Sequence, residues 1–205
     1  MMKTGSFYGL IMGALLVSSL QMACTTEPKQ DVAALKQQGV LENIFQRKSV
    51  RDYTSQPVEE EKINTLLKAA MAAPSGKDRR PWEFVVITER AILDSMAAEL
   101  GNARMLAKAP LAIVVCGDST VSSYWYLDCT AAGQNILLAA EALGLGAVWT
   151  ASYPYADRME VARRYARLPE NVLPLCVIPI GYPNGDFQPK DKFNEAKIHR
   201  NIFRH

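Results

Sequence analysis

One short run in this sequence combines several cations with a hydroxyl group. It reads Arg47-Lys48-Ser49-Val50-Arg51 and places three basic side chains and a serine within five residues. Guanidinium groups bind phosphate oxygens through forked pairs of hydrogen bonds, and a serine hydroxyl can fill a further position on the same phosphate. The competing interpretation is a solvated basic face, because charged side chains mostly stay exposed. The run predicts a phosphate or pyrophosphate site once other segments support it.

The composition argues against several other kinds of chemistry. The two histidines, His199 and His205, both come late in the chain, which disfavours a His-rich zinc site and a Ser-His-Asp or Cys-His nucleophile. No Cys-x-x-Cys spacing occurs, so neither a metal centre nor a dithiol is expected. A net charge of +2 gives no electrostatic footprint for nucleic acid. We therefore expect no metal and no nucleic-acid partner.

Three cysteines lie in the body of the chain, at Cys116, Cys129 and Cys176. Their apolar surroundings favour free thiols that pack as small hydrophobic side chains. The sequence leaves open whether any two of them form a disulfide.

The N-terminal segment has the features of an export signal. Lys3 precedes an apolar stretch at residues 7–20, and Ala23 precedes Cys24; this stretch is too short for a comfortable membrane span. The Ala-Cys pair resembles a bacterial lipoprotein box, although Leu20 lies four residues before the cysteine instead of the usual three. We expect a leader at residues 1–24, a tether and helix start at 25–40, and one domain at 41–205.

This pattern predicts an exported protein, attached by a lipid on Cys24 to the periplasmic or outer-membrane face of a bacterial membrane. Plain secretion and an uncleaved anchor are the alternatives.

The periodicity of apolar residues predicts strands separated by helices. Helices are expected at 32–46, 57–71, 89–100, 126–143 and 157–167, and strands at 84–87, 111–116, 147–150 and 175–180. The second helix should turn Ile63, Leu66, Leu67, Ala70 and Met71 inward. Helix 126–143 is apolar nearly all round, which is typical of a helix in the core or at a subunit interface. The order of elements indicates an α+β or α/β fold.

Four segments, taken in order, resemble the FMN-dependent nitroreductase family. They are the Arg47–Arg51 run, Ala73-Pro74-Ser75-Gly76 with Pro81-Trp82, Gly144-Leu145-Gly146, and Ile180-Gly181-Tyr182-Pro183. The likeness extends from about Ile44 to Phe203. It implies an α+β fold with a mixed central sheet flanked by helices in a three-layer sandwich. It also implies a homodimer formed through the long central helix, with two FMN sites at the interface.

The resemblance assigns roles to individual positions. Arg47, Lys48, Ser49 and Lys192 would bind the FMN phosphate and ribityl chain. Arg51 and Arg104 would lie near the pyrimidine edge of the flavin. Trp149, Thr150 and Ala151 would line one side of the ring, and Pro74, Ser75 and Gly76 would approach it from the other subunit.

One loop departs from the family pattern, which usually reads Asn-x-Gln before Pro-Trp. Here it reads Asp78-Arg79-Arg80. An ionised aspartate only accepts hydrogen bonds, and near the flavin its charge would oppose the reduced anion. We expect Arg80 to pair with Asp78 and neutralise it. The alternative is an exposed ion pair remote from the flavin.

The implied activity is transfer of electrons through FMN, in a ping-pong cycle, from NAD(P)H or another donor to nitroaromatics, quinones or related electrophiles. No catalytic side chain is expected, because the flavin carries the redox chemistry. An FMN-binding lipoprotein without turnover and a dehalogenase-like branch are the alternatives. Tyr124, Trp125 and Tyr126 would form either an aromatic wall over the flavin or part of the core.

Overall fold

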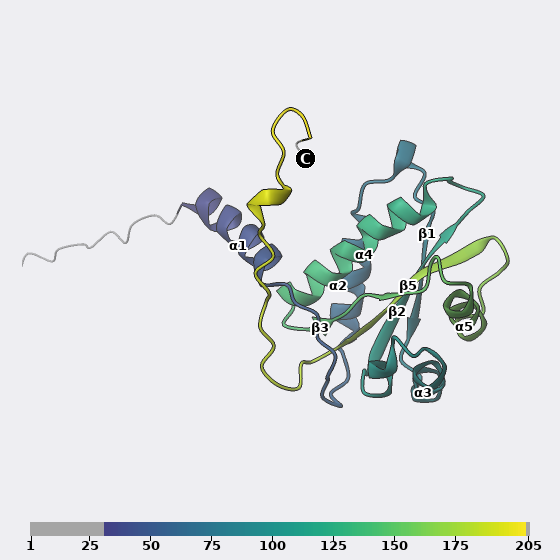
Figure 1. Ribbon diagram of the computed structural model, residues 1–205. Helices are drawn as coiled ribbons and strands as arrows, with labels where there is room; N and C mark the ends of the chain where they lie inside the picture. Colours follow the sequence, from purple (N-terminus) through teal and green to yellow (C-terminus); the bar gives the residue numbers. More distant parts are fainter. Residues whose placement is uncertain (1–30, 204–205) are drawn as a thin grey trace, which may run out of the picture.

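The computed structural model describes residues 31–203 (Figure 1). The predicted leader, Cys24 and residues 25–30 of the predicted tether lie outside the described residues. No helix in the described range is both long and apolar enough to cross a membrane.

A five-stranded sheet forms the centre of the fold. Its strands are β1 (Trp82–Ile87), β2 (Leu111–Asp118), β3 (Gly146–Ala147), β4 (Thr150–Ala151) and β5 (Val172–Gly181). The order is β1-β2-β5-β3, with β4 also paired to β5. Each pair of these strands is antiparallel, and parallel pairing occurs at the isolated bridge between Ser49 and Ala147.

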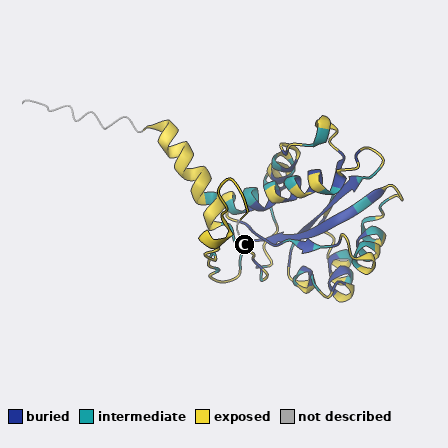
Figure 2. Cartoon of the chain, turned by 45° about the horizontal axis from the view of Figure 1, so that its top comes forward, coloured by how far each residue is buried: buried dark blue, intermediate teal, exposed yellow. Residues whose placement is uncertain are grey.

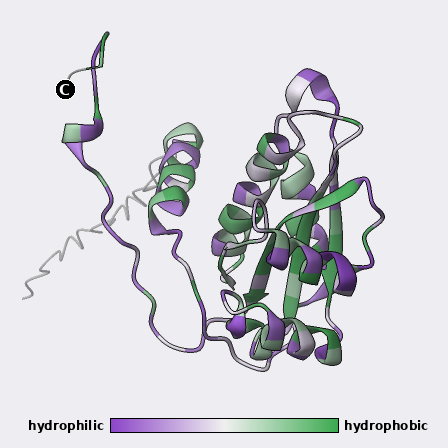
Figure 3. Cartoon of the chain, turned by 45° about the vertical axis from the view of Figure 1, so that its right-hand side comes forward, coloured by the Kyte–Doolittle hydropathy of each residue, from purple (hydrophilic) through white to green (hydrophobic). Residues whose placement is uncertain are grey.

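Helices cover both faces of this sheet, as Figures 1 and 3 show. They are α2 (Glu60–Met71), α3 (Arg90–Glu99), α4 (Trp125–Ala142) and α5 (Ala156–Ala166), and α1 (Val32–Gln46) precedes them in the chain. Along β2, Ile113 and Val115 join the core beneath α2 and α4, whereas Val114 and Cys116 join the core beneath α3 and α5. This alternation buries both faces of the strand. The predicted α+β sandwich is confirmed.

Two predicted elements differ in detail. Helix α2 begins at Glu60, not Pro57, and Met71 at its end is 55% exposed instead of facing inward. The strand predicted at 147–150 forms two short pieces, β3 and β4, which keep one register against β5. The break lies opposite Pro179, which has no N–H to donate to a neighbouring strand.

The body cysteines are buried free thiols. Burial raises the pKa of all three, that of Cys129 to about 12. Trp125 is likewise buried and packs edge-on against Tyr126 and Tyr153, so the core interpretation holds for this residue. Tyr124 remains 55% exposed.

Helix α1 projects from the sandwich, and none of its residues is buried (Figure 2). Its apolar side chains include Leu35, Ile44 and Phe45, each at least 45% exposed. The segment after β5 is similarly exposed and presents Phe193, Ile202 and Phe203. Within residues 31–203, α1 and this segment therefore both present apolar side chains at the surface.

Candidate functional site

The Arg47–Arg51 run follows α1 and lies against the end of the sheet. The Val50 N–H donates to the carbonyl of Ala147 at 3.1 Å, beside the Ser49–Ala147 bridge. The Tyr53 hydroxyl donates to the Val50 carbonyl at 2.6 Å and also lies 3.2 Å from the carbonyl of Pro179. These contacts fix the backbone of the run.

Close approach of the run to the sheet depends on a glycine. Val50 is 1% exposed and packs on Gly146, where an added Cβ would lie 2.6 Å from the Val50 Cβ. The Gly144-Leu145-Gly146 motif therefore leaves the space that the Arg47–Arg51 run occupies.

A cationic cavity opens beside the run, with a volume of about 230 Å³. Its lining consists of Arg47, Lys48, Ser49, Arg51, Gln188, Lys190 and Lys192. We call it the phosphate cavity. None of these lining residues is acidic. The structure thus brings the four predicted side chains of the run together with the predicted Lys192.

Sequence reasoning missed two of the lining residues, Gln188 and Lys190. They come from the irregular segment after β5, where the lining residues alternate along the chain at 188, 190 and 192. In an extended segment, every second side chain points to the same side. The spacing of Gln188 and Lys190 from the predicted Lys192 was therefore the signal available in the sequence.

Lys48 already has a partner on helix α4. Its ammonium nitrogen lies 2.8 Å from a carboxylate oxygen of Glu141, and both side chains are largely buried, at 23% and 17% exposed. The other cations of the phosphate cavity have no ion pair among the described residues. Lys48 therefore connects the run to α4, and its charge is largely compensated.

Arg104 lies on a neighbouring segment, in the short 3-10 helix Arg104–Ala107. The next residue, Met105, packs against Val50 and Tyr53. Arg51 and Arg104 are both exposed and flank this small apolar cluster. Lys108 and Asp52 tie the two segments together at 3.0 Å, and Lys108 lowers the pKa of the Asp52 carboxyl.

The predicted ring-lining residues lie at β4 and just before it. The Trp149 ring packs on Gly133 of α4, where an added Cβ would lie 2.5 Å from that ring. The Thr150 hydroxyl donates to the Val177 carbonyl at 2.6 Å, and the Ala151 carbonyl accepts from the Asn102 amide at 3.1 Å. The amide oxygen of Asn102 is buried without a partner in the described structure.

Pro74, Ser75 and Gly76 lie near the other end of α4. The Gly76 N–H donates to the buried carboxylate of Asp128 at 2.9 Å, in the first turn of α4, whereas Lys48 reaches Glu141 in its last turn. At 1.5 Å per residue, these two anchor points are about 20 Å apart along the helix. One chain therefore does not place this loop at its own phosphate cavity.

The predicted pairing of Asp78 with Arg80 is confirmed. Arg80 Nε donates to Asp78 Oδ1 at 2.7 Å, and an Arg80 terminal nitrogen contacts the other oxygen. This guanidinium lowers the pKa of the Asp78 carboxyl. Lys77, Asp78 and Arg80 all have positive φ values, near 50°, a conformation that costs most side chains about 1–2 kcal/mol.

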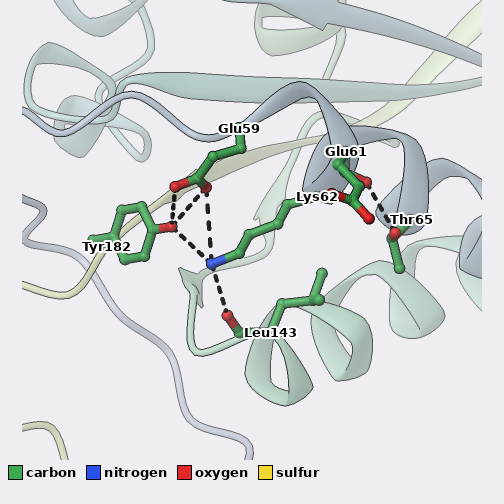
Figure 4. A network of polar contacts seen from close by, with 6 residues as sticks. All are labelled: Glu59, Glu61, Lys62, Thr65, Leu143 and Tyr182. Atoms are coloured by element: carbon green, nitrogen blue, oxygen red, sulfur yellow. Dashed lines mark hydrogen bonds and ion pairs between the residues drawn. The ribbon is translucent and has the colours of Figure 1, made fainter.

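Sequence reasoning also missed a polar network at the C-terminal end of α4 (Figure 4). The Tyr182 hydroxyl donates to Glu59 at 2.6 Å and accepts from Lys62 at 2.7 Å, while Lys62 also donates to the Leu143 carbonyl at 3.3 Å. Tyr182 lowers the pKa of Glu59 and raises that of Lys62. The network ties α2 and the end of β5 to the end of α4, next to Glu141.

Comparisons with known proteins agree with this arrangement. The Nitroreductase family model matches residues 44–101 and 93–182. The chain belongs to the nitroreductase family. A relative from Methanothermobacter thermautotrophicus, named as a NADH dehydrogenase/NAD(P)H nitroreductase, is 46% identical over 78% of this chain and 85% of its own length. The nitroreductase fold and an oxidoreductase activity follow from this membership.

Solved structures of similar proteins also match most of this nitroreductase. A Bacteroides thetaiotaomicron protein of the same name has a TM-score of 0.80 at 66% identity, over 80% of this chain and 98% of its own. An FMN-dependent nitroreductase from Clostridium difficile R20291 has a TM-score of 0.76 at 30% identity, over 80% and 99%. The relatives thus share the sandwich and its helices.

Proposed function

We propose that this nitroreductase binds FMN with its phosphate in the cavity lined by Arg47, Ser49 and Lys192, and reduces electrophilic small molecules. The observation that carries the proposal is the lining of that cavity: several cations, a hydroxyl and an amide, with no acidic side chain. This donor set suits a phosphate dianion. The FMN-dependent family member from Clostridium difficile supports the choice of ligand.

Two exposed arginines suit the rest of the same ligand, and one of them, Arg51, also lines the phosphate cavity. Arg51 and Arg104 flank the cluster of Val50, Tyr53 and Met105 and would lie at the pyrimidine edge of the flavin. A fixed cation there stabilises negative charge on the reduced ring. When bound, FMN would take electrons from a donor and pass them to an acceptor at one site, which predicts ping-pong kinetics. The chain's own residues bind and orient it.

Two observations support a homodimer with shared sites. The loop that contains Ser75 and Gly76 is anchored at the start of α4, far from the phosphate cavity of its own chain. Helix α1 and the segment after β5 also expose apolar side chains. Antiparallel pairing across α4 would bring the loop of one chain to the phosphate cavity of the other and cover apolar surface.

The proposed acceptors are nitroaromatics and quinones. A relative from Salmonella typhimurium named as an oxygen-insensitive NADPH nitroreductase supports the nitroaromatic class, and one from Bacillus subtilis named as an FMN reductase supports flavin chemistry. An iodotyrosine deiodinase from Haliscomenobacter hydrossis is 27% identical over 186 residues, which makes reductive dehalogenation the second candidate.

We further propose that the protein is exported and held at the membrane by a lipid on Cys24, on the basis of the sequence before the described residues. The physiological donor would then be a membrane quinol or a redox partner, because soluble NAD(P)H is expected inside the cytoplasm. NADPH remains a suitable laboratory donor.

An anaerobic titration tests the proposed activity. The purified protein should be yellow, lose its visible flavin absorbance on addition of NADPH or dithionite, and recover it on addition of a nitroaromatic or quinone. Flavin that is reduced but not reoxidised by any acceptor would favour FMN binding without turnover. A colourless protein without affinity for FMN would overturn the proposal.

A further inference from the structure

A second, smaller cavity lies at the start of α4, away from the phosphate cavity. Its volume is about 70 Å³, and it is lined by Gly76, Lys77, Arg79, Ser122, Ser123 and Tyr124. We call it the notch. A water molecule occupies about 30 Å³ in the liquid, so the notch has space for a carboxylate or phosphate group.

The notch has a cationic lining with hydroxyl groups beside it. Lys77 has no ion pair within residues 31–203. Arg79 uses one nitrogen to donate to the Val121 carbonyl at 2.9 Å, which orients the guanidinium and leaves its other donors for a ligand. Ser123 adds a hydroxyl group, whereas the Ser122 hydroxyl donates to Asp128. This combination of donors matches an anion.

The nearby carboxylates have hydrogen-bond partners other than Lys77 and Arg79. Asp78 is held by two nitrogens of Arg80. Asp128 accepts from the Gly76 N–H and the Ser122 hydroxyl, and Asp118 accepts from Thr120 and Asn171. Among residues 31–203, neither Lys77 nor Arg79 forms an ion pair with any of these carboxylates.

The loop that carries these cations is fixed at several points. The Gly76 N–H is bound by buried Asp128, and the Arg80 N–H donates to the Ser75 hydroxyl at 3.0 Å. Lys77 keeps a φ of 54°. This conformation places Lys77 and Arg79 on one cavity beside the exposed ring of Tyr124, which offers a flat surface for an aromatic ligand.

We infer that the notch binds the anionic group of a small-molecule substrate, such as the carboxylate of a nitroarene or quinone. Its role as a substrate subsite rests on the proposed function, in which the same loop approaches the flavin of the partner subunit. Binding of the anion itself does not depend on the proposed function, because all residues that line the notch come from one chain.

The test compares two probes of similar shape, 4-nitrobenzoate and uncharged 4-nitrobenzamide. Calorimetric dissociation constants are measured on the protein as purified, for the wild type, Lys77→Met, Arg79→Met and the control Lys68→Met, an exposed cation on α2. Each notch variant should weaken nitrobenzoate binding about three- to tenfold, the size of one charge-assisted contact at an exposed site. Nitrobenzamide binding should stay within about twofold.

Two further arms make the result specific. Lys68→Met should leave both constants unchanged, and Arg79→Lys should keep most of the nitrobenzoate affinity, since its charge is retained. In parallel, the Michaelis constants for NADPH and NADH show whether the anion belongs to the donor: a rise confined to NADPH in the notch variants would assign the notch to the donor phosphate. Equal losses for the charged and uncharged probes, or no loss for nitrobenzoate and NADPH alike, would overturn the inference.

The proposed function is judged by a different readout in the same samples. Flavin content and dithionite reduction report FMN binding, and neither should change in the notch variants. Loss of flavin from the wild type would refute the FMN proposal while leaving the calorimetric comparison intact.

Discussion

The ammonium group of Lys48 lies 2.8 Å from the carboxylate of Glu141, across the gap between the Arg47–Arg51 run and the last turn of α4. The resemblance to the family made Lys48 a phosphate ligand. In the structure Lys48 instead connects the Arg47–Arg51 run to α4, and Glu141 already compensates its charge. This difference leads to a prediction that separates Lys48 from the other cations of the phosphate cavity.

Lys48→Met should weaken FMN binding less than about threefold, whereas Lys192→Met should weaken it about tenfold, because hydrogen bonds to a charged group are worth more when the cation is not already paired. Glu141→Gln should lower the free energy of unfolding by about 1 kcal/mol, since the ion pair is partly buried. Fluorescence titration of apoprotein with FMN and urea denaturation measure the two effects. Equal losses for the two lysine variants would mean that Lys48 leaves Glu141 for the phosphate.

Gly146 should be required for FMN binding although it has no functional group. Its added Cβ would lie 2.6 Å from Val50, so Gly146→Ala should displace the Arg47–Arg51 run. We expect a loss of about 1–3 kcal/mol in unfolding free energy, typical of overpacking, and weaker FMN binding.

Gly39 on α1 is the matched control, because nothing lies within 4 Å of its added Cβ. Gly39→Ala should keep FMN affinity and raise stability by up to about 1 kcal/mol through helix propensity. If Gly146→Ala bound FMN as tightly as Gly39→Ala, the close approach would have no functional meaning.

The Asp78–Arg80 pair predicts the direction of a change in flavin potential. Arg80→Met would leave the Asp78 carboxylate unpaired and should lower the midpoint potential by about 10–30 mV, a shift of the order of 1 kcal/mol for two electrons. Asp78→Asn added to Arg80→Met should restore it, and Asp78→Asn alone should change it little. The midpoint potentials are measured by equilibration with a reference dye, with xanthine oxidase as the reducing system. Identical potentials in all of these variants would mean that the Asp78–Arg80 pair lies far from the flavin.

Export with lipid attachment is tested at Cys24. The wild type should sediment with membranes and incorporate labelled palmitate. Cys24→Ala removes the proposed attachment site and should abolish the labelling. A Cys116→Ala variant is the control, because that buried thiol lies in the folded body. Unlabelled wild-type protein in the soluble extract would contradict the lipid anchor.

Much of the fold was predictable because its signals are local. The α4 helix is apolar around most of its circumference, and strands β2 and β5 are continuous apolar runs, so each could be placed from a window of sequence. The break between β3 and β4 was not predictable in this way. It depends on Pro179 of another strand, which becomes a neighbour only in the folded sheet.

The candidate site shows the same division. The Arg47–Arg51 run is contiguous, and the resemblance supplied Lys192, so these residues were found. Glu141 and the Tyr182 network were missed because their partners are distant in sequence and ordinary in composition. Lys190 and Gln188 were missed because their alternation with Lys192 is short and lies in an irregular segment, outside any strand.

The most direct test of the central claim is the ratio of the dissociation constants of apoprotein for FMN and for riboflavin, which lacks the phosphate. If the phosphate cavity holds that group, FMN should bind at least about a hundredfold more tightly, and Arg47→Met should reduce the ratio about tenfold or more while changing riboflavin binding little. Equal affinity for the two flavins, or an Arg47→Met effect of the same size on both, would contradict the account.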